Sequence, residues 1–343
     1  MIKATVIGHF GNGLEYYDGQ TVKTKKVTKE LDSCFGENTI KKIDTHGGIK
    51  ALLRAPIDVL LAASCSENII VLPAQNGLKV YAPLLRLAKL LYKVKIHYVV
   101  IGGWLGEIIK NKNMLRKNLT FFDGIYVETN TLKRALESQG FLNVYILPNF
   151  KEEQHVPLLP TETKRPFRLC TFSRVMKEKG IEDAIDAVNI INASYDQAIY
   201  SLDIYGPIDE QQEQWFNCIK QKFGKLIKYK GSIPTEESTN IIKDYFALLL
   251  PTHFYTEGIP GTIIDSYAAG VPVICSKWES FSDIVEEGVT GIGYDFNSEN
   301  GLLDSLKYAN DYPEEILKMK EKCVNKFREY TPSVAMQALI SHM

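Results

Sequence analysis

The strongest constraint on the fold is a series of short, continuous apolar runs that alternate with helical patterns. Strand-length runs rich in β-branched residues lie at residues 4–7, 57–62, 69–72, 97–101 and 125–128, and continue at 168–172, 201–205, 247–251 and 273–275. Continuous rather than alternating apolar strands are typical of parallel sheets that helices cover on both faces. The sequence therefore predicts an α/β protein with doubly wound parallel sheets.

A polar stretch divides this series into two halves. The pair Pro148-Asn149 and a segment over 151–166 with three prolines separate them, and 343 residues exceed the roughly 250 at which a single core stops growing. We predict an N-terminal Rossmann-like domain over 1–163 and a second over 164–327, with a helix over about 328–343 that can pack back on the first. Ligands of open α/β folds bind beyond the carboxyl ends of the strands, so two such domains predict a central cleft.

Charge is distributed unevenly along the chain. Residues 1–165 hold 23 Lys+Arg and 15 Asp+Glu, a net of +8, whereas the remaining residues have a net of −9. The first half is therefore expected to meet an anionic partner, either a phosphorylated ligand or a membrane surface. Its basic segment over 110–117 follows apolar residues and could rest on anionic lipid, or be the solvated face of helices whose apolar residues enter the core. The segment contains Lys110, Lys112, Arg116 and Lys117.

Several classes of protein are excluded. Nucleic-acid-binding modules typically interleave aromatic with basic residues, and this sequence has no such segment. The six cysteines are scattered without a CxxC pair, as expected of free thiols in a reducing cytoplasm. No apolar run reaches the roughly 18 residues of a membrane span, and the N-terminus reads as a first strand rather than a signal region. We expect a cytoplasmic protein, soluble or peripheral on the inner face of the membrane.

The most informative stretch is residues 251–274, in which a strand end leads into a loop, a short helix and a new strand. Glu257 lies in the loop and Asp265 about one turn into the helix, with Gly261 and Thr262 at the helix N-terminus between them. Unpaired N–H donors and the helix dipole suit a phosphate there, and the two carboxylates could accept hydroxyls of a sugar and a ribose. Alternatively, both carboxylates only complement the helix dipole.

Two further segments could meet a phosphate. Arg174 and Lys179 lie at a strand-to-helix junction at the start of the second half, and such a pair of cations suits a diphosphate, although it could also be a solvated basic turn. Residues 8–20 form a glycine turn whose spacing does not match G-x-G-x-x-G. This turn could bring backbone close to a phosphate, or be a plain tight turn.

Taken together, FSRVMKEKG (172–180), EGIPGTIID (257–265) and AAGVPVI (268–274) are similar to the nucleotide-sugar half of retaining glycosyltransferases of family 4, which have the GT-B fold. Within that family, PGTIID with a following Ser-Lys-Trp resembles transferases of bacterial capsule, exopolysaccharide and O-antigen assembly. The resemblance covers roughly residues 165–295. It is much weaker over the first half, where the family binds its acceptor.

The resemblance implies a role for each matching residue. Arg174 and Lys179 would hold the donor diphosphate and Glu257 a hydroxyl of the transferred sugar, as the catalytic set. Asp265 stands where the family has Glu, one methylene longer, and would hold the ribose. His97 opens its strand, whereas many relatives have a His at a strand end, so a buried or capping role is expected for it. The implied donor-binding positions are Gly19, Gly258, Ile259, Gly261, Thr262 and Asp265.

The function that follows is that of a retaining glycosyltransferase. It would move a sugar from a nucleotide-diphosphate sugar, with UDP favoured by family frequency, to a lipid-pyrophosphate-linked saccharide. The sequence has no D-x-D, so no metal or other cofactor is demanded, and electrostatic stabilisation of the leaving diphosphate falls to the cationic side chains. Two alternatives stay open: a GT-B sugar-nucleotide epimerase, and a catalytically silent GT-B subunit that supports a partner transferase.

Overall fold

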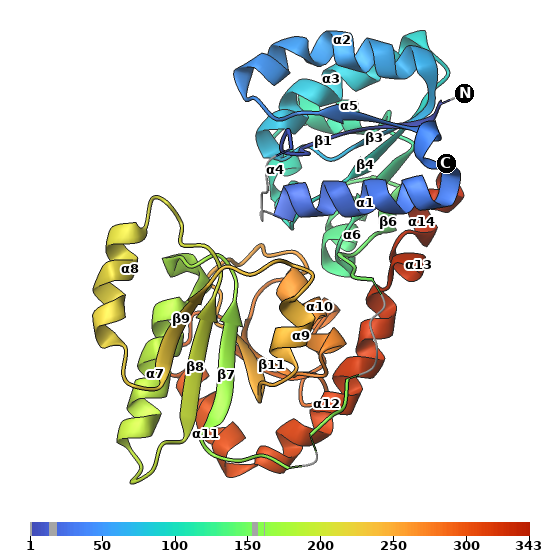
Figure 1. Ribbon diagram of the computed structural model, residues 1–343. Helices are drawn as coiled ribbons and strands as arrows, with labels where there is room; N and C mark the ends of the chain where they lie inside the picture. Colours follow the sequence, from blue (N-terminus) through green and yellow to red (C-terminus); the bar gives the residue numbers. More distant parts are fainter. Residues whose placement is uncertain (1, 14–18, 153–156, 161) are drawn as a thin grey trace. The chain divides into compact units, whose positions relative to one another are not determined.

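The protein, described by a computed structural model over residues 2–13, 19–152, 157–160 and 162–343, divides into two compact units (Figure 1). The first unit is Met1–Asn149 with Pro332–Met343, and the second is Phe150–Thr331. Residues 150–163, which the sequence boundary places in the first domain, group here with the second. The reason is local: Phe150 is buried, and the Lys151 N–H donates to the Tyr330 carbonyl over 3.0 Å.

The first unit contains a six-stranded parallel sheet in the order β2-β1-β3-β4-β5-β6. Strand β1, next to the edge strand β2, pairs with β2 and β3, so that Ile7 lies opposite both Ile43 and Val71. The strands are β1 (Ile2–Gly8), β2 (Ile40–Asp44), β3 (Ser66–Val71), β4 (Lys95–Val99), β5 (Gly124–Val127) and β6 (Val144–Ile146).

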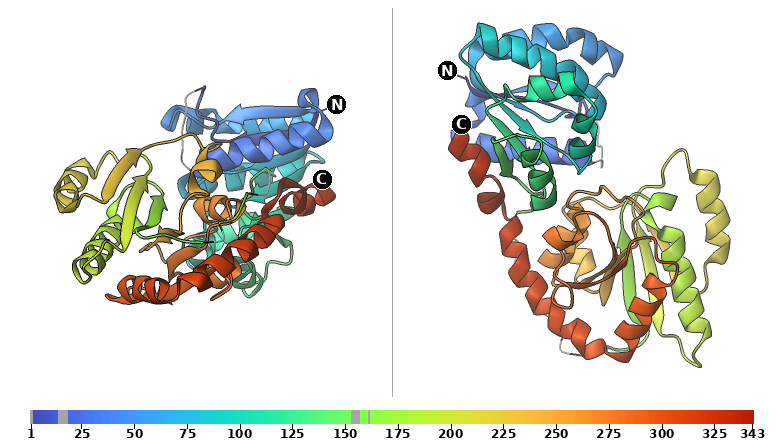
Figure 2. Two further views of the ribbon diagram at one scale, coloured as in Figure 1. Left: turned by 60° about the horizontal axis from the view of Figure 1, so that its bottom comes forward. Right: turned by 180° about the vertical axis from the view of Figure 1, so that it is seen from behind.

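Helices cover both faces of this sheet, with α2 and α3 on one side and α1 on the other (Figures 1 and 2). Residues 57–62, expected as a strand, lie instead within α2. That helix turns its small side chains, including Ala51, Ala55 and Ala62, into the core. The helices are α1 (Gly19–Phe35), α2 (Ile49–Cys65), α3 (Gln75–Leu91), α4 (Leu105–Lys110), α5 (Asn113–Leu119), α6 (Asn130–Glu137), α13 (Pro332–Ala335) and α14 (Gln337–His342), with a 3-10 turn η1 (Glu37–Thr39).

The second unit also contains a six-stranded parallel sheet, in the order β12-β11-β10-β7-β8-β9. The strand order reverses between β7 and β10, because the chain leaves β7 toward one edge and returns at β10 to build the other. Ligands of open α/β sheets bind beyond the carboxyl ends of the strands at such a point. The strands are β7 (Phe167–Phe172), β8 (Tyr200–Tyr205), β9 (Ile227–Gly231), β10 (Ala247–Leu250), β11 (Val273–Lys277) and β12 (Gly291–Asp295).

Two apolar clusters line the faces of the second sheet, one with α7 and α11 and the other with α9 and α10, and α12 contributes to both. This two-sided cover is the reason that the strands read as continuous apolar runs. In the described part of the chain no helix is long and apolar enough to cross a membrane. The helices are α7 (Ile181–Ala193), α8 (Glu213–Ile219), α9 (Ser238–Ile242), α10 (Gly261–Ala268), α11 (Gly301–Asp311) and α12 (Pro313–Phe327), with 3-10 turns η2 (Lys177–Lys179), η3 (Lys220–Lys222), η4 (Phe281–Asp283) and η5 (Arg328–Tyr330).

A buried ion pair attaches α1 to the carboxyl edge of the first sheet. Lys23 Nζ lies 2.6 Å from Glu128 Oε1 and donates to the Val100 carbonyl over 3.3 Å, and the side chains of Lys23 and Glu128 are each only 3% exposed. Burial lowers the pKa of Lys23, and Glu128 opposes that effect by favouring the charged form. The start of α1 is thereby held beside the loops that follow β4 and β5.

We predict that Lys23→Met destabilises the first unit by about 3–5 kcal/mol, because it removes the cation that pairs with the buried Glu128 carboxylate. Lys23→Met/Glu128→Met should recover most of that loss. The exposed pair Lys3–Glu67, at 2.8 Å, provides the control, since solvent screens it and Lys3→Met should lower stability far less than Lys23→Met does. Hydrogen exchange of β1 and β5 amides measures all three, and equal effects of the two lysine substitutions would contradict the prediction.

Candidate functional site

At the carboxyl edge of the second sheet, the turn after β7 and the loop after β10 pack backbone against backbone. The His253 N–H donates to the Glu178 carbonyl over 2.8 Å. Gly180 adopts φ +66°, and a Cβ at this position would lie 1.9 Å from the Pro251 carbonyl oxygen. Only glycine permits both the backbone conformation and this approach. The loop geometry thus depends on one residue without a side chain.

This close approach brings together two side chains from distant parts of the sequence. Lys179 Nζ donates to Glu257 Oε2 over 2.6 Å, and the side chains are 15% and 20% exposed. The Thr252 hydroxyl lies 3.3 Å from the same carboxylate oxygen, and the Lys179 ammonium lies 5.0 Å from the centre of the Phe254 ring. Two of the residues expected in the catalytic set therefore form a partly buried ion pair.

Arg174, the third member of that set, pairs elsewhere. Its Nη1 lies 3.4 Å from Asp209 Oδ2, and half of its side chain is exposed. The loop after β7 carries Arg174, and the loop after β8 carries Asp209. The two loops approach closely where Gly206 has no side chain, since a Cβ there would lie 1.8 Å from the Ser173 carbonyl oxygen. Arg174 thus stands at the same edge of the sheet as Lys179, with a separate carboxylate partner.

Asp265, in α10, has a donor on each carboxylate oxygen. Lys151 Nζ lies 2.8 Å from Oδ1 and the Ser238 hydroxyl lies 2.7 Å from Oδ2. Lys151 is buried and also donates to Ser238 Oγ over 2.7 Å. Neither Lys151 nor Ser238 was predicted from the sequence, because no local pattern links residues that lie 114 and 27 positions from Asp265.

The N-terminus of α10 lacks a side-chain cap. Pro260 precedes the helix and makes no capping hydrogen bond, and space is open around Gly261. Thr262 Oγ1 is buried, and it has no hydrogen-bond partner within the described residues. Gly258 and Ile259, expected as donor-binding positions, are both buried in the preceding loop. Free N–H groups and an unsatisfied hydroxyl make this end suitable for an anion.

In the first unit, Gly19 is the first residue of α1, with open space where a Cβ would stand. The preceding Asp18 lies outside the described residues. A nearby polar cluster was missed by sequence reasoning: His9 Nε2 lies 3.1 Å from His46 Nδ1. Burial would raise the pKa of Asp44, but backbone N–H donors, including those of Phe10 and His46, outweigh burial and lower it.

Two other sequence expectations concern the first unit. His97 is fully buried, within 3.0 Å of the Tyr126 hydroxyl and 3.1 Å of Asn68 Oδ1, and burial lowers its pKa to about 4. It is a neutral core residue at pH 7. The basic segment 110–117 spans the end of α4 and most of α5; its cations are exposed, while Leu105, Ile109 and Leu115 enter the core. These three apolar side chains are therefore not available to a lipid surface, whereas the exposed cations are.

Comparison with protein families identifies the chain. The family model for glycosyl transferases group 1 matches residues 151–329, which is more than half of the chain and includes every candidate residue of the second unit. The chain therefore belongs to the glycosyl transferases group 1 family. No three His, Cys, Asp or Glu side chains gather in a way that could hold a metal ion within the described ranges.

Curated relatives place it beside enzymes of polysaccharide synthesis. It is 26% identical over 131 residues to the amylovoran biosynthesis glycosyltransferase AmsK of Erwinia amylovora, and 23% identical over 185 residues to the putative colanic acid biosynthesis glycosyltransferase WcaL of Salmonella typhimurium. These alignments cover 37% and 51% of this chain. The chain spans only 32% and 45% of the relatives' own lengths.

Solved structures confirm the predicted GT-B fold. The lipopolysaccharide outer core galactosyltransferase WaaB matches with a TM-score of 0.71 and 16% identity, covering 99% of this chain and 98% of that one. Anabaena HepE in complex with UDP and glucose matches with a TM-score of 0.74 and 11% identity, covering 99% of each chain. The sucrose-phosphate synthase from Thermosynechococcus elongatus matches with a TM-score of 0.77 and 14% identity, covering 100% and 98%.

We predict that Gly180→Ala destabilises the second unit by about 2–5 kcal/mol, because the new Cβ meets both a left-handed backbone and the Pro251 carbonyl. Gly224→Ala is the matched control: a Cβ there has only an ordinary contact, 3.5 Å from Asn189 Oδ1, so its effect should stay within about 0.5 kcal/mol. Hydrogen exchange of β7 and β10 amides reports both. The geometric account fails if the two variants behave alike.

Proposed function

We propose that this protein transfers a glycosyl group from a nucleotide-diphosphate sugar to a saccharide acceptor during assembly of a bacterial cell-surface polysaccharide. The observation that carries the proposal is the Lys179–Glu257 pair, 2.6 Å apart, in the same loop system as the uncapped N-terminus of α10. Family membership supports glycosyl transfer. The names of the two curated relatives support the polysaccharide context.

The cationic groups are suited to the leaving group. Negative charge develops on the diphosphate as the glycosidic bond breaks, and preorganised donors stabilise that charge. Lys179 has three N–H donors, of which Glu257 takes one, so others can reach a phosphate oxygen. Arg174 offers a planar fork of donors, and Gly261 and Thr262 offer the helix N-terminus. In this proposal the chain supplies the positive charge itself, and no metal cofactor is required.

The carboxylates would orient the sugar and the ribose. Two donors, Lys179 and Thr252, converge on Glu257 Oε2, which leaves Oε1 to accept a hydroxyl of the transferred sugar. Each Asp265 oxygen holds one donor and has a second lone pair for a ribose hydroxyl. The amides of Gly258 and Ile259 would face the sugar.

UDP is the nucleotide that we propose first, since a solved structure with this fold contains UDP and glucose. Retention of configuration would follow if the acceptor hydroxyl attacks from the face that the leaving group occupies, with a donor phosphate oxygen as the base. A lipid-pyrophosphate-linked saccharide is the proposed acceptor. These features extend the resemblance of the residues to family 4.

We predict that Glu257→Ala keeps the fold and lowers transfer from the accepted UDP-sugar at least about 100-fold, because the sugar loses its orienting carboxylate. Glu321→Ala, at an exposed carboxylate on α12, is the control and should keep full activity. UDP should raise the melting temperature of the wild type, and Lys179→Met should weaken that shift. Radiolabelled sugar transfer and thermal-shift assays measure these effects.

Three results would count against the proposal. Full transfer by Glu257→Ala would reject the assigned site. Conversion of the donor to another sugar nucleotide without acceptor would indicate an epimerase instead. Co-purification with a partner transferase, together with no nucleotide binding, would indicate a silent subunit.

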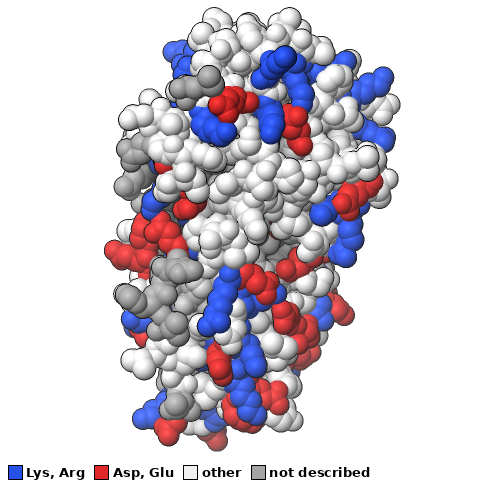
Figure 3. All heavy atoms as spheres, turned by 90° about the vertical axis from the view of Figure 1, so that its right-hand side faces the viewer, with Lys and Arg blue, Asp and Glu red and all other residues white. Residues whose placement is uncertain are grey.

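Contact with an anionic membrane is part of the proposal, and an apolar stripe on α2 supports it. Ile49, Leu53 and Ile57 are 76%, 76% and 61% exposed, although α2 buries its alanines. Four-residue spacing places them on one face of the helix. In addition, α3 exposes Leu87, Leu90 and Leu91. Figure 3 shows Lys and Arg side chains on the surface of the first unit, at the top of the view. A unit that exposes both apolar and basic side chains suits the interface of an anionic bilayer.

We predict that the wild type floats with vesicles of anionic phospholipid and that Leu53→Ser/Ile57→Ser reduces flotation severalfold, because apolar area is lost from the interface. Neutralising Lys110, Lys112, Arg116 and Lys117 should also reduce it, and more at low salt. Ile190→Ser, which removes a 51% exposed residue from the second unit, is the control. Undiminished flotation of both test variants would contradict membrane contact through the first unit.

A further inference from the structure

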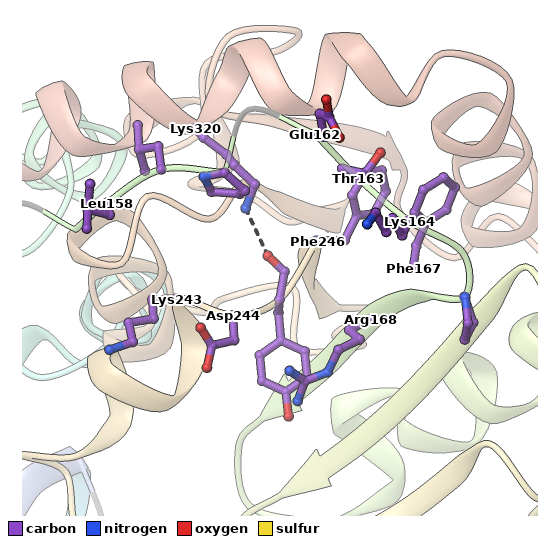
Figure 4. A pocket seen from close by; sticks show the side chains of 14 residues that line it. Leu158, Glu162, Thr163, Lys164, Phe167, Arg168, Lys243, Asp244, Phe246 and Lys320 are labelled. Carbon is purple, nitrogen blue, oxygen red and sulfur yellow. Dashed lines mark hydrogen bonds between the residues drawn. The ribbon is translucent and has the colours of Figure 1, made fainter.

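A cavity of the second unit lies at the opposite edge of its sheet from the candidate site. Phe167 opens β7 and Tyr245 precedes β10, and both line this cavity, whereas Arg174 and Glu257 follow the carboxyl ends of the same strands. The cavity is lined by residues 158–160, 162–164, 166–168 and 243–246, and by Lys320 of α12 (Figure 4). Its volume of about 570 Å³ lies within the usual range for small-molecule sites.

The wall of this cavity contains an unusual buried lysine. Three lysines are buried within the described ranges: Lys23, Lys151 and Lys320. The first two have carboxylate partners, Glu128 at 2.6 Å and Asp265 at 2.8 Å. Lys320 is 1% exposed, and its Nζ donates over 2.8 Å to the backbone carbonyl of Tyr245, the dashed line in Figure 4.

One carbonyl satisfies one of the three N–H donors of an ammonium group and supplies no negative charge. Burying a charge is costly unless it is paired and hydrogen-bonded. Burial lowers the pKa of Lys320 to about 8, so the group is still mostly protonated at pH 7. A cation with spare donors therefore lines the cavity.

The other walls combine positive charge with apolar surface. The Arg168 guanidinium lies 4.4 Å from the centre of the Tyr245 ring and forms an ion pair with Asp203 at 3.6 Å, while nearly half of its side chain stays exposed. Phe167 and Phe246 add aromatic surface to the lining of the cavity. The two carboxylates of the lining, Glu162 and Asp244, belong to exposed residues, where solvent and salt screen them.

We propose that this cavity is a second ligand site, which binds a small organic oxyanion, a phosphomonoester or a carboxylate, through Lys320 and Arg168. The oxyanion supplies Lys320 with a negative charge that none of the described residues provides, and the apolar part of the ligand lies against the aromatic rings. The site is separate from the proposed donor site, because it lies at the amino ends of β7 and β10. It depends on none of the residues assigned to glycosyl transfer.

The test is isothermal titration of the full chain with phenyl phosphate, inorganic phosphate and benzoate. We expect saturable binding of phenyl phosphate, tighter than that of inorganic phosphate, because only the former covers the aromatic wall. Lys320→Met should weaken it at least about tenfold, since it removes a charge-assisted hydrogen bond. Lys322→Met, at an exposed position of the same helix, is the matched control and should bind as the wild type does.

Comparison among the probes and variants decides the proposal. Binding of benzoate as well as phenyl phosphate supports a site for either oxyanion, and binding of phenyl phosphate alone supports a phosphomonoester site. Lys179→Met removes a cation of the proposed donor site. If the Lys179→Met protein loses phenyl phosphate binding and the Lys320→Met protein keeps it, the proposal is overturned. Absence of saturable binding would also overturn it.

Arg168→Leu keeps the proposal testable if Lys320→Met does not fold. Nearly half of the Arg168 side chain is exposed, so the substitution should leave the fold intact. It should weaken phenyl phosphate binding severalfold. If Lys320→Met does not fold, and a folded Arg168→Leu protein binds phenyl phosphate as the wild type does, the proposed site is overturned.

Discussion

The contact between the Gly180 turn and the Pro251 carbonyl is the constraint on which the candidate site depends. A Cβ at Gly180 would come within 1.9 Å of that oxygen, so the two loops can meet only where a side chain is missing. Their contact places the lysine of one loop against the glutamate of the other, 78 residues apart in sequence. The site is therefore built by backbone packing, and the ion pair is its consequence.

Buried lysines perform three different tasks in this protein. Lys23 and Glu128 hold α1 to the first sheet. Lys151 ties the segment after the first unit to Asp265, so the residue assigned to the ribose is held by the start of the second unit. Lys320 has a carbonyl alone, which leaves its charge without compensation within the described residues. The first two lysines are explained by the fold, and the third motivates the proposed oxyanion site.

Local pattern was enough to predict the α/β class and most strands, because a two-sided core requires continuous apolar runs. It failed at residues 57–62, where an apolar run lies in α2, since periodicity cannot distinguish a buried strand from a helix segment over so short a range. The domain boundary was also placed late, because the proline-rich composition of 150–163 does not show that Phe150 and Lys151 pack with the second unit. Composition shows that a segment connects two domains, but not which of the two domains the segment packs with.

The sequence by itself determined the parallel α/β design, the family resemblance and the residue types at the candidate site, because these depend on local patterns and short motifs. Tertiary structure alone decided which charges meet: Lys179 with Glu257, Arg174 with Asp209, and Lys151 with Asp265. It also decided that His97 is a neutral core residue and that Lys320 has no carboxylate partner among the described residues. Such pairings join residues from different strands and helices, so only the packing of the sheets could select them.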